Sequence, residues 1–136
     1  MKKEDVIETF NLLQTDENVK KVFDADISAR IPYYLHCCVY DFDREVWVED
    51  DILYNYDLGG NCQTLKLLNE RGACLMYYQI RPYLRPIHKL TKEELEELEF
   101  LTDNNYVDYC NKHHIDYRNL IPKGLALEAK EEMYEY

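Results

Sequence analysis

The stretch RPYLRPIHKLTKEELEELEF, residues 81–100, limits the fold most strongly because two prolines are followed at once by a helix-start signal. Proline lacks a backbone N–H, so Pro82 is expected to end a strand. Pro86 repeats that restriction four residues later. The pattern predicts that residues 81–87 run extended over the surface, as a joint between a strand-rich part and a helical part.

A capped helix is predicted directly after this joint. Thr91 suits the N-cap position, and Glu94 three residues later completes a capping box. Leu90 and Leu95 match the hydrophobic staple that often accompanies such a box. We therefore interpret the acidic run Glu93–Glu99 as a helix start and a solvated face rather than as a binding site. The apolar stripe of this helix would consist of Leu95, Leu98 and Leu101.

The rest of the chain predicts an α+β fold. Strands are predicted over residues 33–42, 45–54 and 73–80, and residues 62–68, which fit a strand or a short helix, are assigned to a second hairpin after a loop at 58–61. Helices are predicted over residues 4–14 and 104–113, with a short helical turn over 17–24. Because the connections between strands are short, we expect a small antiparallel sheet or half-barrel over about 33–80. An N-terminal helix and two C-terminal helices would pack on it.

Length and composition favour one domain over residues 1–136. The five cysteines are an odd number, with Cys37 and Cys38 adjacent, which is a poor disulfide framework and suits a reducing cytoplasm. No apolar run approaches the roughly 20 residues that span a bilayer, and the N-terminus lacks the apolar stretch of a secretory signal. We therefore expect a cytoplasmic protein without a membrane partner.

The charge is strongly acidic and unevenly distributed. The net charge is −11, and residues 41–60 alone hold seven acidic side chains and one basic one. Residues 61–90 reverse the sign, with five basic side chains and one acidic one. A field of the overall sign repels phosphate backbones, which argues against general nucleic-acid binding. It favours a solvated surface or a partner protein with a basic surface.

The acidic hairpin around Trp47 is the first candidate site. If Val46 and Val48 point into the core, strand alternation places Trp47 at least partly exposed on the opposite face. Tryptophan is enriched among the residues that dominate binding energy. The predicted protein-binding residues are Trp47, Glu49, Asp50, Asp51 and Tyr54. The alternatives are an amphipathic hairpin with its apolar side on the core, and an imitation of a nucleic-acid strand.

Two arginines form a second candidate site. Arg81 and Arg85 lie four residues apart, and paired guanidinium groups bind carboxylates or phosphates well. The alternative is a structural role, in which they pair with the abundant acids or stack on Tyr83 and its neighbours.

A Cys/His cluster near the C-terminus is the weakest candidate. Cys110 and His113 are three residues apart, and His114 and Asp116 follow directly, which are residue types that zinc accepts. A second pair of ligands would have to come from elsewhere, such as His36–Cys38. We favour the alternative that these histidines lie at the negative end of a helix, so no metal and no cofactor is expected.

The C-terminal half resembles a known group of proteins. The residues that carry the resemblance are Pro82-Tyr83-Leu84-Arg85-Pro86, Thr91-Lys92-Glu93-Glu94, His114-Ile115-Asp116-Tyr117-Arg118-Asn119-Leu120-Ile121 and Gly124-Leu125-Ala126. Over residues 81–129 the chain is similar to uncharacterised proteins encoded by phages and prophages of gut Bacteroidetes. Arg81 stands where those proteins often have lysine, and His88-Lys89 where serine-rich residues are common. The resemblance implies a phage or prophage origin and a bacterial cytoplasm, and it implies no activity.

These observations favour a non-enzymatic accessory protein that acts by binding another protein. The sequence has no glycine-rich phosphate loop, no nucleophile elbow and no His-Glu-x-x-His helix. One alternative is an acidic, nucleic-acid-mimicking inhibitor of a host factor. The other is a small metal-binding protein or enzyme that uses the Cys/His set. Association of the chain with itself is compatible with each.

Overall fold

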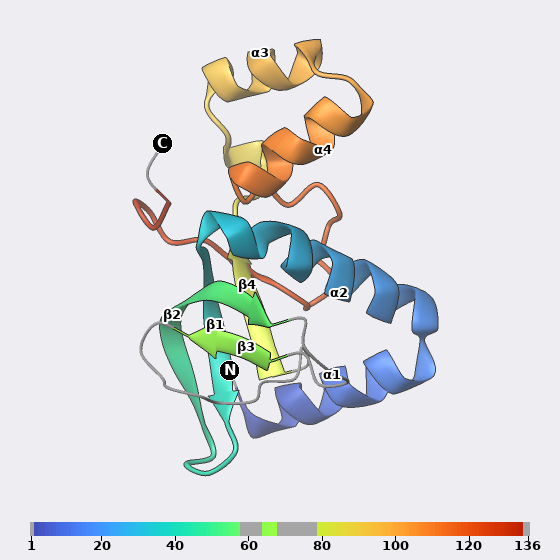
Figure 1. The fold of residues 1–136 in the computed structure, drawn as a ribbon, viewed down its shortest axis with the longest axis vertical. Coiled ribbons are helices and arrows are strands. Elements are labelled where there is room, and N and C mark those ends of the chain that lie inside the picture. The colour runs from blue at the N-terminus through green and yellow to red at the C-terminus, as the bar shows by residue number, and fades with distance from the viewer. Residues whose placement is uncertain (1, 58–63, 68–78, 135–136) are drawn as a thin grey trace.

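Two helices begin the chain. The computed structural model describes residues 2–57, 64–67 and 79–134 (Figure 1). Helix α1 spans Lys3–Thr15, which confirms the helix predicted over 4–14. Helix α2 spans Glu17–Arg30 and is therefore much longer than the short turn predicted over 17–24. A 3-10 turn, η1, follows at Ile31–Tyr33 and leads into the sheet.

The sheet confirms the predicted α+β class. Its strands are β1 (Leu35–Asp41), β2 (Val46–Asp57), β3 (Thr64–Leu67), β4 (Ile80–Leu84) and β5 (Leu127–Glu128), in the spatial order β3-β2-β1-β4-β5. The first four strands pair antiparallel, as predicted, and the short β5 joins β4 in parallel. Of the segment 62–68, residues 64–67 form a strand, as assigned, but β3 pairs with β2 and is not next to β4, the strand that contains residue 80 of the predicted hairpin partner. The loop predicted at 58–61 and most of the strand predicted at 73–80 lie outside the described residues.

Strand β4 corrects the prediction for the proline joint. Pro82 lies in the middle of the strand, opposite Cys37 of β1, and does not end it. All five residues of β4 are buried, so this part of the predicted surface segment lies inside the protein. Proline removes one hydrogen-bond donor but still adopts extended backbone, and the apolar neighbours Ile80 and Leu84, both fully buried, hold the strand in the core.

The main core lies where the N-terminal helices, the central strands and the C-terminal segment meet. It consists of Leu13, Phe23, Ile27, Leu35, Cys37, Val39, Ile80, Leu84, Leu120, Leu125 and Ala126. Phe23 and Ile27 are four residues apart and both fully buried, so one face of α2 supplies the centre of this cluster. Segments from both ends of the chain therefore close the same core.

A helical lobe stands at the opposite end of the molecule from the β1–β2 hairpin (Figure 1). It contains a 3-10 turn, η3 (Ile87–Lys89), helix α3 (Lys92–Phe100) and helix α4 (Asp103–Lys112). A second, smaller core holds it together: Leu90, Leu98, Cys110 and Ile115. Within the described part of the chain, no helix combines the length and the apolar character needed to cross a membrane.

Candidate protein-binding surface

The start of α3 is built as the sequence predicts. The Thr91 hydroxyl accepts a hydrogen bond from the Glu94 backbone N–H at 3.2 Å. In return, the Glu94 carboxylate accepts one from the Thr91 N–H, also at 3.2 Å. The two bonds satisfy backbone donors that a helix start otherwise leaves unpaired, so the predicted capping box is confirmed.

Arg85 ties this helix start to the sheet. Its Nη2 lies 2.6 Å from Oε1 of Glu94, with both side chains largely buried. Partial burial alone would raise the pKa of Glu94, but hydrogen bonds from Arg85 and Thr91 hold that pKa below its ordinary value. Arg85 also exchanges backbone hydrogen bonds with His114 and Asp116 at 2.8 and 2.9 Å. The orientation of α3 relative to the end of β4 is therefore fixed.

A second polar contact fixes α3 against α4. The Tyr109 hydroxyl donates to the Glu97 carboxylate at 2.6 Å. Burial and the nearby carboxylate raise the pKa of Tyr109 to about 12, so the phenol remains a donor at neutral pH. Leu98 next to Glu97 is buried in the lobe core. The face of α3 that carries Leu98 is thus the inner one.

The outer face of α3 presents an aromatic ring among acids. Successive helix residues are rotated by about 100°, so Phe100 points about 200° away from Leu98 and lies between Glu93 and Glu96 on the outer side. Phe100 is 86% exposed, the highest value among the large apolar side chains described. Glu93 and Glu96 are exposed beside it. We call Glu93, Glu96 and Phe100 the α3 outer face.

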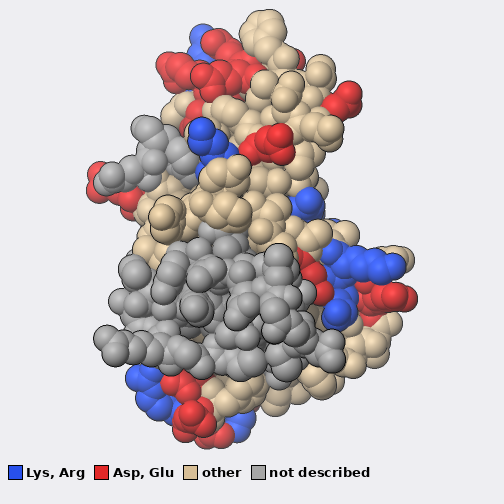
Figure 2. Space-filling view, viewed as in Figure 1, with Lys and Arg blue, Asp and Glu red and all other residues tan. Residues whose placement is uncertain are grey.

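The lobe as a whole is acidic. Residues 91–112 hold seven acidic side chains and two basic ones. Figure 2 shows acidic side chains gathered over this end of the molecule, with a bare protrusion of uncharged atoms above them. Glu94 is bonded to Arg85 and Glu97 to Tyr109. The outer acids Glu93 and Glu96 face solvent and are accessible to a partner.

The structure holds Trp47, the centre of the predicted site, against the body of the protein. Its indole Nε1 donates to the Lys2 carbonyl at 2.9 Å, and its ring packs edge-on against Tyr40 at 5.3 Å between centroids. The Arg81 guanidinium lies 5.3 Å from the same ring. Trp47 is half-buried, in agreement with the expectation that it is partly exposed, but its three contacts do not make it a free anchor.

The prediction that Val46 lies in the core is wrong. Val46 is 47% exposed, because it pairs with Asp41 next to the turn of the hairpin, beyond the edge of the core. Val48 is half-buried opposite the buried Val39, as expected for a core-facing residue. The other predicted site residues, Glu49, Asp50, Asp51 and Tyr54, lie on β2, and their side chains fall outside the described part of the chain.

The two predicted anion-binding arginines are separated and engaged in different contacts. Arg81 is 2% exposed, and its guanidinium donates to the Asp5 carbonyl at 3.0 Å and to the Thr9 hydroxyl of α1. Burial lowers the pKa of Arg81 from its ordinary value. Arg85 forms the ion pair with Glu94 described above. Both side chains have structural contacts, as the alternative interpretation anticipated, but only Arg85 pairs with an acid, whereas Arg81 bonds a carbonyl and a hydroxyl and lies over Trp47 rather than Tyr83.

The Cys/His residues occupy separate positions. Cys110 is fully buried in the lobe core, where burial raises the pKa of its thiol. The buried His114 bonds the Tyr33 carbonyl through Nε2 at 2.8 Å, and both Asp116 oxygens accept backbone N–H groups of residues 120 and 121. In the described ranges, no three His, Cys, Asp or Glu side chains converge in a way that would hold a metal ion.

Sequence reasoning missed Phe100. The sequence contains a signal for it, because Phe100 lies off the apolar stripe formed by Leu95, Leu98 and Leu101 and falls among glutamates. An aromatic ring on a solvated helix face is not explained by packing in the core. Leu95 is also 40% exposed, so the inner stripe is narrower than predicted. No protein family, curated protein or solved structure matches the chain.

Proposed function

We propose that this chain is a non-enzymatic accessory protein, encoded by a phage or prophage and acting in the bacterial cytoplasm, that binds a basic surface of another protein through the α3 outer face. The observation that carries the proposal is Phe100, 86% exposed on a helix that is fixed on its other side. An aromatic ring held rigidly in solvent loses hydration when a partner covers it, at little cost in ordering.

The surrounding charges indicate the kind of partner. Glu93 and Glu96 lie on either side of the ring, in a segment, residues 91–112, with a net charge of −5. Acidic groups around an apolar anchor favour a partner with lysine or arginine around an apolar recess, and they speed the encounter at low salt. The resemblance to phage proteins supports the cellular setting, as do the three described cysteines, which are free thiols.

The experiment is a capture from a bacterial host lysate with three immobilised chains: wild type, Phe100→Ala and Phe42→Ala. Phe42 is a matched control because it is 47% exposed on the hairpin, at the other end of the molecule. We expect the wild type and Phe42→Ala to retain the same basic protein and Phe100→Ala to lose it. A protein that Phe100→Ala retains and Phe42→Ala loses would instead place the site on the hairpin.

Salt separates binding by this face from mimicry of a nucleic acid. An apolar anchor with a few ion pairs should weaken by a small factor between 50 and 200 mM salt, whereas multiple phosphate-like contacts lose roughly 10³–10⁵ in affinity over that range. The Glu93→Gln, Glu96→Gln double variant should slow association and leave dissociation nearly unchanged. Loss of all binding at 200 mM salt, with no effect of Phe100→Ala, would favour the mimicry alternative.

A further inference from the structure

A cavity of about 390 Å³ lies where η1, the start of β1, the end of α4 and the C-terminal segment meet. We call it the aromatic cavity, because six aromatic rings line it: Tyr33, Tyr34, His36, His113, His114 and Tyr134. Its volume lies in the range of small-molecule sites. Aromatic rings on several sides suit a ligand that is itself a flat ring.

Most of these rings are held in place by contacts within the protein. The His114 imidazole bonds the Tyr33 carbonyl at 2.8 Å and stacks on Tyr134, with centroids 4.2 Å apart. The Tyr134 hydroxyl accepts a hydrogen bond from the His36 N–H at 2.9 Å and donates one to the Tyr83 carbonyl at 2.8 Å. The walls of the aromatic cavity are therefore formed in the free protein, so a ligand has few side chains to order when it binds.

Tyr34 lies at the exposed edge of the aromatic cavity in an unfavourable backbone conformation. Its φ is 56°, in the left-handed region that bulky residues rarely adopt, and its side chain is 65% exposed. Glycine or asparagine would make the same turn into β1 with less strain. A ring that is so exposed also contributes little to the core. Strain of this kind concentrates at sites where a side chain is positioned for a ligand.

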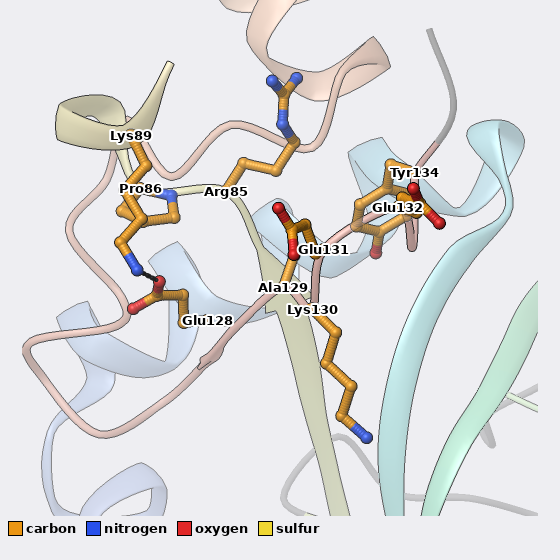
Figure 3. A pocket seen from close by; sticks show the side chains of 9 residues that line it. All are labelled: Arg85, Pro86, Lys89, Glu128, Ala129, Lys130, Glu131, Glu132 and Tyr134. Atoms are coloured by element: carbon orange, nitrogen blue, oxygen red, sulfur yellow. Dashed lines mark hydrogen bonds and ion pairs between the residues drawn. The ribbon is translucent and has the colours of Figure 1, made fainter. Parts of the chain in front are cut away.

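The charges around the aromatic cavity differ from those of the rest of the protein. Its described lining includes one lysine, Lys112, and no Asp or Glu, although the chain has 27 acidic residues. Lys112 forms no ion pair within the described part of the chain. The neighbouring cavity of about 590 Å³, which shares Tyr134, is lined by three basic and three acidic side chains (Figure 3). The aromatic cavity therefore favours a ligand with a negative group, and its neighbour does not.

The end of α4 does not oppose a negative ligand. The last carbonyls of a helix carry partial negative charge when they have no hydrogen-bond partner. Here the carbonyls of residues 109–111 all accept hydrogen bonds, one of them from the Arg30 guanidinium at 3.1 Å. The ammonium group of Lys112 thus sets the sign of the charge at this side of the cavity.

We propose that the aromatic cavity binds a planar aromatic molecule that carries a negative group, with its ring against Tyr34 and its phosphate or carboxylate beside Lys112. Stacking on the tyrosine and a charge-assisted hydrogen bond from the lysine would supply the affinity. Nucleoside monophosphates and aromatic carboxylates both have this chemistry. Neither Tyr34 nor Lys112 belongs to the α3 outer face, so this proposal and the proposed function can fail separately.

Titration calorimetry at about 150 mM salt, which screens the net charge of the chain, tests the ligand class. The probes are AMP and benzoate, their uncharged counterparts adenosine and benzamide, and inorganic phosphate, which has no ring. We expect AMP or benzoate to bind with a Kd below about 1 mM. The uncharged counterpart and inorganic phosphate should bind at least about tenfold more weakly, because each lacks one of the two groups.

The probes also distinguish the source of the ligand. Binding of AMP without benzoate would indicate a nucleotide, and binding of benzoate without AMP would indicate an aromatic acid; both results support the proposal. No binding of either probe would overturn it, as would equal binding of an uncharged counterpart or of inorganic phosphate.

Two variants locate the binding. Tyr34→Asn removes the ring and tolerates the left-handed conformation, so it should weaken binding at least about tenfold without lowering the melting temperature. Tyr34→Phe keeps the ring and should bind like the wild type. Lys112→Gln should weaken binding severalfold, whereas Lys21→Gln, which changes an exposed lysine on α2, should have no effect.

Melting temperature and affinity together separate a binding role from a structural one. A lower melting temperature in Tyr34→Asn, with unchanged affinity, would show that the ring serves the fold and would overturn the proposal. Unchanged affinity in both Tyr34→Asn and Lys112→Gln would place the bound probe elsewhere on the protein, which also contradicts it.

Discussion

The guanidinium of Arg30 forms a bidentate ion pair with the carboxylate of Asp26 one turn earlier on α2, and neither side chain is accessible to solvent. Nε and Nη2 of Arg30 lie 2.9 and 3.0 Å from the two carboxylate oxygens. Arg30 also donates to the carbonyls of Cys110 and Ile115 at 3.1 and 2.7 Å, and Arg118 pairs with the same carboxylate at 2.7 Å. One buried ion pair thus joins α2 to the end of the helical lobe.

Breaking this pair on one side should destabilise the protein strongly. Arg30→Met keeps much of the volume but leaves the Asp26 charge and two carbonyls without that partner, and we expect a loss of about 3–5 kcal/mol. The double variant Asp26→Leu, Arg30→Met should recover part of the loss, because the buried carboxylate, which Arg118 alone would otherwise have to neutralise, is removed as well. Urea unfolding followed by circular dichroism measures both. Equal stability of Arg30→Met and wild type would mean that the pair contributes nothing.

Removing the capping box of α3 should destabilise the protein less than breaking the Arg30–Asp26 pair. Thr91→Ala removes the acceptor of the Glu94 N–H, and the free energy of unfolding should fall by about 1 kcal/mol. Thr91→Ser keeps the hydroxyl and should be almost neutral. Thermal unfolding of the two variants side by side is the measurement, and equal losses from both would contradict the cap.

His114 should make the protein less stable in mild acid. Burial, with smaller contributions from Arg30 and His36, lowers the pKa of His114 from 6.5 to about 3, although the Tyr33 carbonyl and Asp26 oppose the shift. Below pH 6.5 the His114 imidazole is therefore protonated in the unfolded chain but stays neutral in the folded chain. The free energy of unfolding should fall as the pH drops, by up to about 1.4 kcal/mol per pH unit until about pH 3.

Urea unfolding between pH 5 and 7 measures this slope while most carboxylates remain ionised. The pKa of His113 is also lowered, so it adds to the slope in the same direction. His114→Gln should flatten the dependence, and Thr91→Ala, a destabilised control, should keep it. A slope that is unchanged in His114→Gln would assign the effect to other groups.

Purified protein should contain no stoichiometric zinc, and a chelator should leave its melting temperature unchanged. The reason is geometric: Nε2 of His114 is bonded to a carbonyl, and the Asp116 carboxylate is occupied by two backbone N–H groups. Elemental analysis and thermal unfolding with and without chelator are the measurements. One zinc per chain, with a lower melting temperature after chelation, would establish a metalloprotein.

Iodide should quench the fluorescence of Trp47 to an intermediate extent. The ring is half-buried between Tyr40 and Arg81, and its N–H is bonded to the chain. The same protein in concentrated urea gives the fully accessible reference for this single tryptophan. Quenching equal to that reference would restore Trp47 as a freely exposed anchor, and complete protection would place it in the core.

Local chemistry was predictable from the sequence. Thr91 and Glu94 specify a helix start within four residues, and the structure confirms it. The length of α2 was not predictable in the same way, because Asp26 and Arg30 occupy core positions at helical spacing and appear as breaks in the apolar pattern. Only their mutual neutralisation in the fold makes these positions suitable for burial.

Contacts between distant segments escaped prediction for a different reason. Tyr134 and His36 are 98 residues apart in the chain, and nothing in either local sequence specifies their meeting. Pro82 likewise lies in a buried strand because its neighbours are apolar and β1 is available to pair with it, which is information that resides in the tertiary structure. The sequence predicted an exposed aromatic ring among acids at Trp47, but that ring is half-buried, and Phe100 among the glutamates of α3 is 86% exposed.

The short parallel strand β5 has a consequence for behaviour at high concentration. Two segments from the C-terminal part of the chain cover the end of β4 on its outer side, since Tyr83 and Leu84 pair with β5 and Arg85 forms a parallel bridge to Ile115. An open strand margin is a template on which further chains stack into aggregates. The edge strand on this side is therefore β5, which has only two residues, and so short an edge is a poor template for further chains.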